Sequence, residues 1–157
     1  MIVVLDNVRS IFNVGAIFRT SDAVGVEKLI LSGYTPHPPE LKLIKTSLGA
    51  QDYVEWNNFN NDETITYLND LKNKGFNIVS IEQNNNSICY TEAAKNGVLT
   101  WTDTVYIFGN EITGVNKELL NISNYIVEIP MYGKKNSLNI SVSVGIILYE
   151  SRKYKPE

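Results

Sequence analysis

The last third of the chain contains two polar loops in quick succession, with the sequences Y-I-F-G-N-E-I-T-G-V-N-K-E-L-L at residues 106–120 and Y-I-V-E-I-P-M-Y-G-K-K-N-S-L-N-I-S-V at residues 125–142. Each loop follows a short run rich in β-branched and aromatic residues, 105–108 in the first case and 125–129 in the second, and such runs predict strands. In open α/β sheets the loops that leave the carboxyl ends of neighbouring strands line one crevice, where ligands bind. We therefore expect the two loops to share a ligand site.

The rest of the chain predicts an α/β fold, because short apolar runs alternate with segments of helical periodicity. The predicted strands span residues 2–5, 29–31, 53–56, 78–81, 105–108 and 125–129, and the predicted helices span residues 13–24, 41–46, 62–74 and 90–95. Residues 33–39, with three prolines, and the Asn-rich residues 83–87 are predicted as loops. Strands separated by helices favour a parallel sheet with helices on both faces.

Length and composition limit the class of protein. The 157 residues are expected to form one domain, 1–157, which buries roughly two thirds of its unfolded surface. The chain has no apolar run of membrane-spanning length and no basic, apolar signal sequence, so we expect a cytoplasmic protein without a membrane partner. Cys89 and His37 are the only residues of their types, which disfavours disulfides, metal sites and histidine-based catalysis. We interpret His37, between Pro36 and Pro38, as an ordinary loop residue.

The net charge of −3 argues against a nucleic acid as partner, because RNA binding usually depends on a basic surface. Local clusters of basic residues matter more for RNA binding than the net charge of the whole chain. Two are visible, Lys134-Lys135 within the second loop and Arg152-Lys153-Tyr154-Lys155 at the C-terminus. Each cluster taken alone is more typical of a solvated surface than of a binding site.

A third segment, N-V-G-A-I-F-R-T-S-D-A-V-G at residues 13–25, completes a specific set of motifs. N-x-G-x-x-x-R, F-G-N-E-x-x-G and I-P-M followed by S-L-N, in this order, resemble the three motifs of the SpoU, or TrmH-like, branch of the SPOUT RNA ribose 2′-O-methyltransferases. The resemblance spans nearly the whole chain. It implies S-adenosylmethionine as cofactor, tRNA or rRNA as substrate, no metal, a deep trefoil knot at the C-terminus, and a homodimer whose active sites draw on both subunits.

Residues 138–148 are ambiguous, because L-N-I-S-V-S-V-G-I-I-L alternates apolar and polar positions as a strand does. We predict a helix, because the resemblance implies one. Ser141 and Gly145, one helical turn apart, are expected to allow close packing of a helix that is buried on several sides. In the predicted helix 13–24, the expected core face consists of Val14, Ile17, Phe18 and Ala23.

The first motif supplies Asn13 and Arg19. One interpretation makes Asn13 a helix N-cap and Arg19 a surface residue. The resemblance implies instead that Arg19 contacts RNA phosphate and activates the ribose 2′-hydroxyl. Guanidinium keeps its proton in proteins, so stabilising the developing alkoxide and holding the phosphate is a better role for Arg19 than that of a general base. Asn13 is then expected to orient Arg19 or the ribose.

The second motif supplies Gly109 and Glu111. An ordinary strand-ending turn between Gly109 and Gly114, with Glu111 in solvent, is consistent with composition alone. The resemblance implies that Gly109 belongs to the cofactor loop, where a missing side chain lets the backbone approach the methyl donor. It also implies that Glu111 holds Arg19 or positions the acceptor nucleotide.

The third motif follows a strand and precedes the predicted C-terminal helix, so Ser137 has a structural interpretation as the N-cap of that helix. The resemblance implies that Ile129 and Leu138 hold the cofactor through backbone groups and apolar contacts, together with Met131. It also implies that Ser137 and Asn139 face the catalytic centre. Ile81, at the end of an earlier strand, is expected to border the adenosine pocket.

Two other classes of function stay open. A non-catalytic RNA-binding or assembly protein with the same fold would suit the acidic pI and the expected lack of a separate RNA-binding domain, but a decayed site should have lost some of the motif residues. An α/β enzyme that uses another nucleotide is disfavoured, because the glycine-rich G-x-G-x-x-G and the P-loop are missing.

The identity of the RNA substrate also stays open. The chain length resembles that of small enzymes that modify the tRNA wobble ribose, whereas the first motif resembles the branch that methylates tRNA D-loop or 23S rRNA guanosines.

Overall fold

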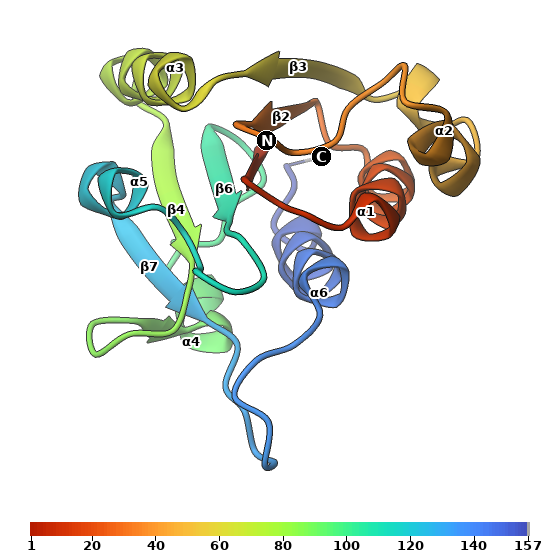
Figure 1. Ribbon diagram of the computed structural model, residues 1–157. Coiled ribbons are helices and arrows are strands. Elements are labelled where there is room, and N and C mark those ends of the chain that lie inside the picture. The colour runs from red at the N-terminus through yellow and green to blue at the C-terminus, as the bar shows by residue number, and fades with distance from the viewer. Residues whose placement is uncertain (157) are drawn as a thin grey trace.

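A seven-stranded sheet runs through the whole molecule in the order β3-β2-β1-β6-β4-β7-β5, and all of its paired strands are parallel (Figure 1). The computed structural model describes residues 1–156. The strands are β1 (Ile2–Asp6), β2 (Lys28–Ser32), β3 (Glu55–Phe59), β4 (Asn77–Ile81), β5 (Ile88–Cys89), β6 (Thr104–Phe108) and β7 (Tyr125–Glu128). The central strands β1 and β6 are buried along their full length, as expected for parallel strands covered on both faces.

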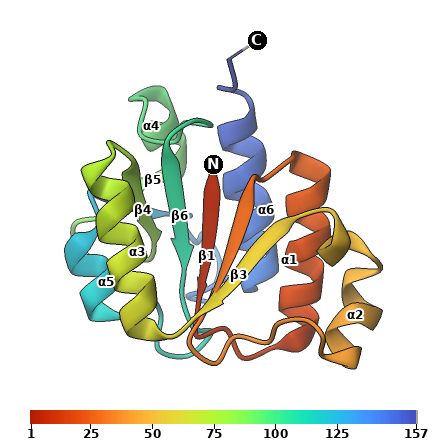
Figure 2. The same ribbon diagram turned by 90° about the horizontal axis from the view of Figure 1, so that it is seen from above.

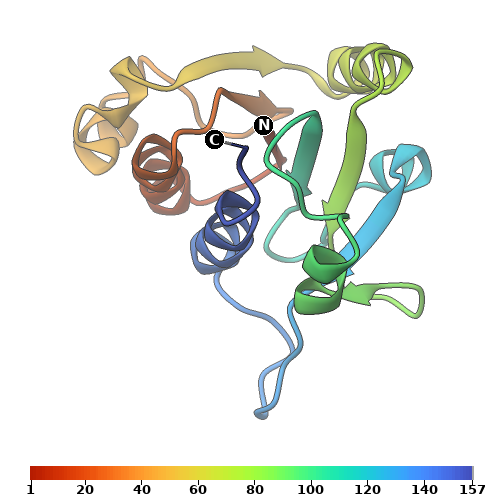
Figure 3. The same ribbon diagram turned by 180° about the vertical axis from the view of Figure 1, so that it is seen from behind.

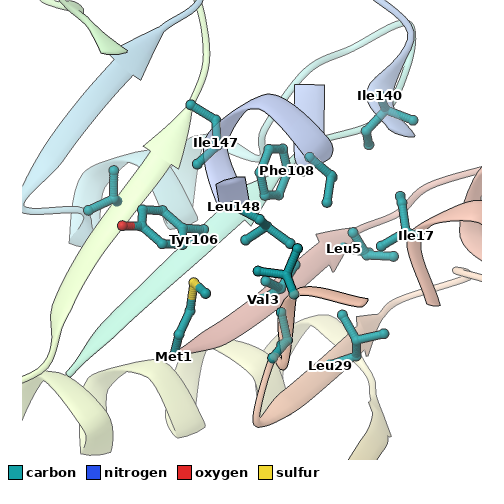
Figure 4. Packing of buried hydrophobic residues seen from close by; sticks show 14 of the residues in the cluster. Met1, Val3, Leu5, Ile17, Leu29, Tyr106, Phe108, Ile140, Ile147 and Leu148 are labelled. Atoms are coloured by element: carbon teal, nitrogen blue, oxygen red, sulfur yellow. The ribbon is translucent and has the colours of Figure 1, made fainter. Parts of the chain in front are cut away.

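Helices cover both faces of the sheet, as predicted (Figure 2). They are α1 (Ile11–Val24), α2 (Leu41–Ser47), α3 (Asn61–Asn73), α4 (Tyr90–Lys95), α5 (Lys117–Ile122) and α6 (Ile140–Arg152), with a short 3-10 helix η1 (Ala50–Asp52). Side chains alternate along β1, so Val3 and Leu5 pack into the core under α1 and α6, whereas Ile2 and Val4 pack into the core under α3 and α5. In the first core, Tyr106 and Phe108 of β6 lie against the α6 residues Ile147 and Leu148 (Figure 4).

Helix α1 begins two residues before the predicted helix and is capped by Ser10, whose hydroxyl accepts a hydrogen bond from the backbone N–H of Asn13 (3.3 Å). The N-cap interpretation of Asn13 is therefore wrong. The buried stripe contains Val14, Ile17, Phe18 and Val24. Ala23, which we expected in the core, is exposed, because it lies off the three- and four-residue spacing that Val24 continues.

Helix α6 confirms the helical prediction for this segment, although it begins at Ile140 rather than residue 138. Its buried residues Ile140, Val144, Ile147, Leu148 and Ser151 follow helical spacing, so the alternating pattern of the segment was misleading. The expected close packing at Gly145 is wrong within this chain, because no atom lies within 4 Å of the position that a Cβ would take there.

The sequence predicted the other elements to within two residues, except that β3 ends at Phe59 and the predicted strand ended at residue 56, and three short elements were not predicted. These are η1, β5 and α5, which contain three, two and six residues. Elements this short cover less than two periods of a helix or strand, so periodicity is a weak signal for them, although the six-residue α4 was predicted. The loop 33–39 is free of helix and strand, as predicted, and the His37 ring in it stacks on Trp56 with 6.2 Å between ring centroids.

Both chain termini lie at the amino-terminal edge of the sheet, opposite the loops that follow the strands (Figure 2). The C-terminal basic run therefore lies far from those loops. Two of its cations pack on one indole instead: the Arg152 guanidinium lies 4.6 Å and the Lys155 ammonium 5.6 Å from the centroid of the Trp101 ring. No helix within residues 1–156 combines the length and apolarity that a membrane crossing requires.

Candidate functional site

A cleft of about 560 Å³ opens at the carboxyl ends of β6, β4 and β7, the edge at which we expected a ligand site. Its walls come from the loops after these strands and from the first turns of α1 and α6. The lining residues are Asn13, Ile81, Glu82, Gln83, residues 108–112, Gly114, Glu128, Ile129, residues 136–140 and Ser143. The three sequence motifs, which are far apart along the chain, therefore meet at one cleft.

Glu111 holds the loop between β1 and α1. Its carboxylate accepts hydrogen bonds from the backbone N–H groups of Arg9 (3.0 Å) and Ser10 (3.1 Å) and from the Asn13 side-chain amide (3.3 Å). Partial burial acts to raise the pKa of Glu111, but these bonds and one from its own backbone N–H outweigh burial, so the pKa lies below its ordinary value. Glu111 is therefore an anion at neutral pH, suited to positioning other groups rather than to accepting a proton.

The Asn13 side chain connects all three motifs. Its amide nitrogen donates to Glu111 of the second motif, and its amide oxygen accepts from the Asn139 amide nitrogen of the third motif (3.1 Å). Asn139 in turn caps α6, because its side-chain oxygen accepts from the Ser141 backbone N–H (2.9 Å). Glu111, Asn13 and Asn139 thus form one hydrogen-bonded row at the cleft, which we call the motif row.

Ser137 lines the cleft but does not cap α6, so its N-cap interpretation is wrong. It is exposed and lies two residues before the true cap, Asn139. The segment from residue 131 to residue 139 extends from the body of the molecule before α6 begins (Figure 3). Lys134 and Lys135 lie in it and are exposed, close in sequence to the cleft residues.

Arg19 is an exposed residue of α1, six residues beyond Asn13, and it is not among the residues that line the cleft. Six residues correspond to more than one and a half helical turns, so Arg19 and Asn13 leave α1 in different directions. Within one chain, the carboxylate of Glu111 is engaged by Arg9, Ser10 and Asn13. The single chain thus brings four of the five predicted catalytic residues together and leaves Arg19 outside.

Four of the five predicted cofactor residues line the cleft, namely Ile81, Gly109, Ile129 and Leu138. Met131, two residues beyond Ile129, is half-buried and is not part of the lining. At Gly109, a Cβ atom would overlap the backbone of Gly114 and Val115. Glycine is therefore required here because the loop folds back on itself, which differs from the close approach to a ligand that we expected.

Three polar residues that the sequence analysis missed hold the cleft walls. Glu82 accepts hydrogen bonds from the backbone N–H groups of Val115 (2.9 Å) and Gln83 (3.0 Å), so it joins the loops after β4 and β6. Asp6, only 2% exposed, accepts from the Asn116 backbone N–H (2.8 Å). Burial raises the pKa of Asp6, although the hydrogen bonds that it accepts act in the opposite direction.

Asn110 is the third missed residue, and it is 6% exposed. Its side-chain oxygen accepts from the backbone N–H groups of Ile112 (2.8 Å) and Thr113 (3.0 Å), the pattern of an Asx turn. Its amide nitrogen donates to the Asn7 carbonyl and to the Tyr34 hydroxyl, both at 2.8 Å. The known tendency of asparagine to close such turns was the signal that could have identified it.

The charge of Glu111 should make the stability of the protein depend on pH. Because its pKa in the folded protein lies below the ordinary value, its ionised form stabilises the fold above about pH 4.5, and this contribution is lost as the pH falls through the folded-state pKa. We expect Glu111→Gln to lower the midpoint of thermal unfolding at pH 7. The difference from wild type should shrink as the pH is lowered from about 5 to about 3. Circular dichroism melts across this range measure it, and a difference that stays constant with pH would contradict the assignment.

Comparison with known proteins agrees with the motifs. Residues 1–149 match the model of the SpoU rRNA Methylase family. A tRNA (guanosine(18)-2′-O)-methyltransferase of Aquifex aeolicus is 36% identical over 158 aligned positions, which cover 100% of this chain and 71% of that protein. An AdoMet-bound rRNA methyltransferase from Sinorhizobium meliloti superimposes with a TM-score of 0.87 at 28% identity, covering 99% of this chain and 57% of that one.

A third similar structure is reported for the 2-OH methylation of C/U34 on tRNA. It superimposes with a TM-score of 0.81 at 25% identity, and the match covers 98% of this chain and 94% of that chain. This chain therefore spans nearly all of one solved relative but little more than half of the Sinorhizobium protein. Within residues 1–156, no three His, Cys, Asp or Glu side chains are grouped in a way that could hold a metal ion.

Proposed function

The chain belongs to the SpoU rRNA methylase family, and we propose on this basis that it transfers a methyl group from S-adenosylmethionine to a ribose 2′-hydroxyl of tRNA or rRNA. The observation that carries the proposal is the motif row: Glu111, Asn13 and Asn139, from three distant motifs, are hydrogen-bonded to one another at the edge of one cleft. A row of amides and a carboxylate there can orient a sugar hydroxyl. An RNA substrate further supports a cytoplasmic location.

The cleft fits S-adenosylmethionine in size and in the chemistry of its walls. Its volume of about 560 Å³ is in the range of small-molecule sites. Ile81, Ile129 and Leu138 offer apolar side chains for the adenine ring, and the strand-ending backbone from Gly109 onward offers polar groups. Met131 would extend the apolar wall from the adjoining loop. When bound, the cofactor supplies an electrophilic sulfonium methyl group.

The protein's own residues hold the acceptor ribose. Asn13 and Asn139 orient the ribose through their amides, while the charge of Glu111 fixes Asn13 and the loop before α1. Ser137 faces the same space from the third motif. Arg19 binds the phosphate next to the acceptor ribose and stabilises the negative charge that develops on the 2′-oxygen. It stays protonated throughout, so the hydroxyl proton leaves to solvent or to RNA phosphate.

We also propose that the chain acts as a homodimer. Exposed apolar side chains lie on α1 and α6, which pack side by side (Figure 3), and Phe12, Val142 and Tyr149 are among them. The open position at Gly145 gives a second α6 helix room for close approach. Arg19 lies outside the cleft of its own chain, which suits a site completed by a partner's Arg19.

The dimer can be tested by placing a charge on this face. Val142→Glu should convert the protein to monomers and abolish methyl transfer, because a carboxylate buried between helices is costly. Light scattering during size-exclusion chromatography measures the mass. Thr66→Glu, an exposed position on α3 at the opposite face of the sheet, is the matched control and should stay dimeric. A wild-type protein that is monomeric at high concentration would refute the dimer.

The family further supports a deep trefoil knot in the C-terminal part and a single SPOUT methyltransferase domain over residues 1–157. Two of the loops that would form such a knot are tied to each other, because Glu82 after β4 accepts a hydrogen bond from the Val115 backbone N–H after β6. Tracing the backbone in an experimental structure tests the knot. A backbone that forms an unknotted line when its two ends are pulled apart would refute it.

The function itself is tested by two measurements on the same protein. Calorimetric titration with S-adenosylmethionine and with its demethylated product should show binding, and incubation with labelled donor and total tRNA or rRNA should label ribose. Labelled ribose 2′-oxygen, located by methylation mapping, identifies the RNA. Binding of RNA without any methyl transfer would favour the non-catalytic alternative. Binding of phosphorylated nucleotides in place of the methyl donor would favour another α/β enzyme.

A further inference from the structure

The loop after β2 carries an exposed aromatic ring that is held at both ends. Tyr34 is 62% exposed. Its backbone N–H donates to the Asn7 side-chain oxygen (3.3 Å), and its hydroxyl accepts from the Asn110 amide nitrogen (2.8 Å). An exposed ring that is fixed in advance costs less entropy when it binds a partner. The Tyr34 ring is therefore held in place before a ligand binds.

A second cavity, of about 340 Å³, lies beside this ring. It is lined by residues 33–37, 39 and 40, which include the aromatic residues Tyr34 and His37 and two prolines. The His37 ring stacks on Trp56. Glu40 is the acidic residue among those that line the cavity. Aromatic and proline residues beside polar groups suit a planar heterocycle that also carries hydrogen-bonding atoms.

One hydrogen bond connects the cavity to the cleft, because Tyr34 lines the cavity and its partner Asn110 lines the cleft. Asn110, which holds the Tyr34 hydroxyl, also closes the turn at Ile112 and Thr113 that precedes Gly114. The loops after β2, β1 and β6 leave adjacent strands, and the loop after β1 carries Arg9, bound to Glu111 through its backbone. The cavity and the motif row therefore lie at one edge of the sheet.

Exposed cations lie on the elements next to this corner, alongside the acidic residues Glu40 and Asp52. Arg9, Lys42 and Lys45 are exposed, on the loop before α1 and on α2, which begins directly after the cavity-lining Glu40. The neighbouring helices α1 and α2 pack against each other. Cations around a stacking surface are the combination by which proteins hold single-stranded nucleic acid.

We propose that Tyr34 and this cavity bind an unpaired nucleobase of the RNA substrate, one that neighbours the nucleotide whose ribose is methylated. The base stacks on the Tyr34 ring, and the basic residues of the corner hold the adjoining phosphates. The inference rests on the proposed function and adds to it that the substrate is presented as a single strand or loop, not as a duplex.

The test compares Tyr34→Ala with Tyr34→Phe. Phenylalanine keeps the ring and loses only the hydrogen bond to Asn110, whereas alanine loses both. Binding of a fluorescent single-stranded RNA of mixed sequence, measured by anisotropy with the demethylated cofactor present, should weaken roughly tenfold for Tyr34→Ala. Tyr34→Phe, which keeps the ring but loses this bond, should weaken binding clearly less than Tyr34→Ala. Tyr53→Ala, an exposed tyrosine before the amino end of β3, is the matched control and should bind as wild type does.

Three outcomes would overturn the inference: Tyr34→Ala binds the single strand as wild type does, Tyr34→Phe loses as much affinity as Tyr34→Ala, or wild type prefers the same RNA as a duplex. Titration of each variant with S-adenosylmethionine separates this failure from failure of the proposed function. A wild type that binds the cofactor and methylates RNA, with an indifferent Tyr34→Ala, refutes only the stacking site. A wild type that binds neither cofactor nor single-stranded RNA refutes both.

Discussion

Replacing Arg19 with alanine is expected to lower the rate of methyl transfer by at least about 100-fold, the effect typical of removing a group that stabilises developing negative charge. The affinity for S-adenosylmethionine should stay the same, because Arg19 lies outside the cleft that would hold the cofactor. Single-turnover transfer of labelled methyl to RNA measures the rate, and calorimetry measures the affinity.

Arg19→Lys is the informative companion. Lysine keeps the charge but not the planar fork of donors that grips phosphate in two places, so partial activity is expected. The residue is exposed on a helix, so neither change should alter the thermal unfolding midpoint by more than a degree or two. A folded Arg19→Ala protein that has lost cofactor affinity would refute the assignment of Arg19 to the RNA.

Which subunit contributes Arg19 to each active site can also be tested. If each site uses the partner's Arg19, then Arg19→Ala mixed with a variant inactive in its own cleft, such as Glu111→Ala, should regain part of the activity. Mixed dimers would contain one site with both wild-type residues. Mixing that restores nothing, in proteins shown to exchange subunits, would place Arg19 and Glu111 in the same chain's site.

The sequence predicted the strands well because buried parallel strands are short apolar runs, and β1 and β6 are buried along their full length. Helix α6 was harder. Its segment alternates like a strand, and only the resemblance favoured a helix. The buried residues show that spacing over three turns, and not alternation over a few residues, was the relevant period. Gly145, interpreted as a packing position, is open within the chain.

The candidate site was predictable as a set of residues but not as a geometry. Asn13 bonds to Glu111 and Asn139, which are 98 and 126 residues away in the sequence, and no local pattern encodes such contacts. Asp6 and Glu82 were missed for the same reason, since each satisfies a backbone N–H of a distant loop. Gly109, which was predicted to belong to the cofactor loop, lines the cleft, and the backbone of its own loop explains why glycine is needed there.

Because the loop backbone packs closely on Gly109, Gly109→Ala is the second change with a large expected effect. The new Cβ would overlap the backbone of Gly114 and Val115, and that backbone is held in place. Gly114 exchanges two hydrogen bonds with Asn110 (2.9 and 3.0 Å), and the Val115 N–H is bound by Glu82. The loop can therefore accept a methyl group only by opening, which costs about 1–3 kcal/mol as overpacking does elsewhere.

An opened loop displaces the backbone from the cleft that the cofactor would occupy, so the affinity for S-adenosylmethionine should fall at least about tenfold, with a lower unfolding midpoint. Gly133→Ala is the matched control: it lies in the neighbouring loop, and no atom would contact its Cβ within 4 Å, so it should bind the cofactor as wild type does. Gly114→Ala should fall between them. Its Cβ would meet the carboxylate end of the Glu82 side chain rather than backbone, but its φ of +73° strains any residue with a side chain. A Gly109→Ala protein as stable as wild type and with unchanged cofactor affinity would show that the close packing of residue 109 on the backbone of residue 114 does not shape the cofactor site.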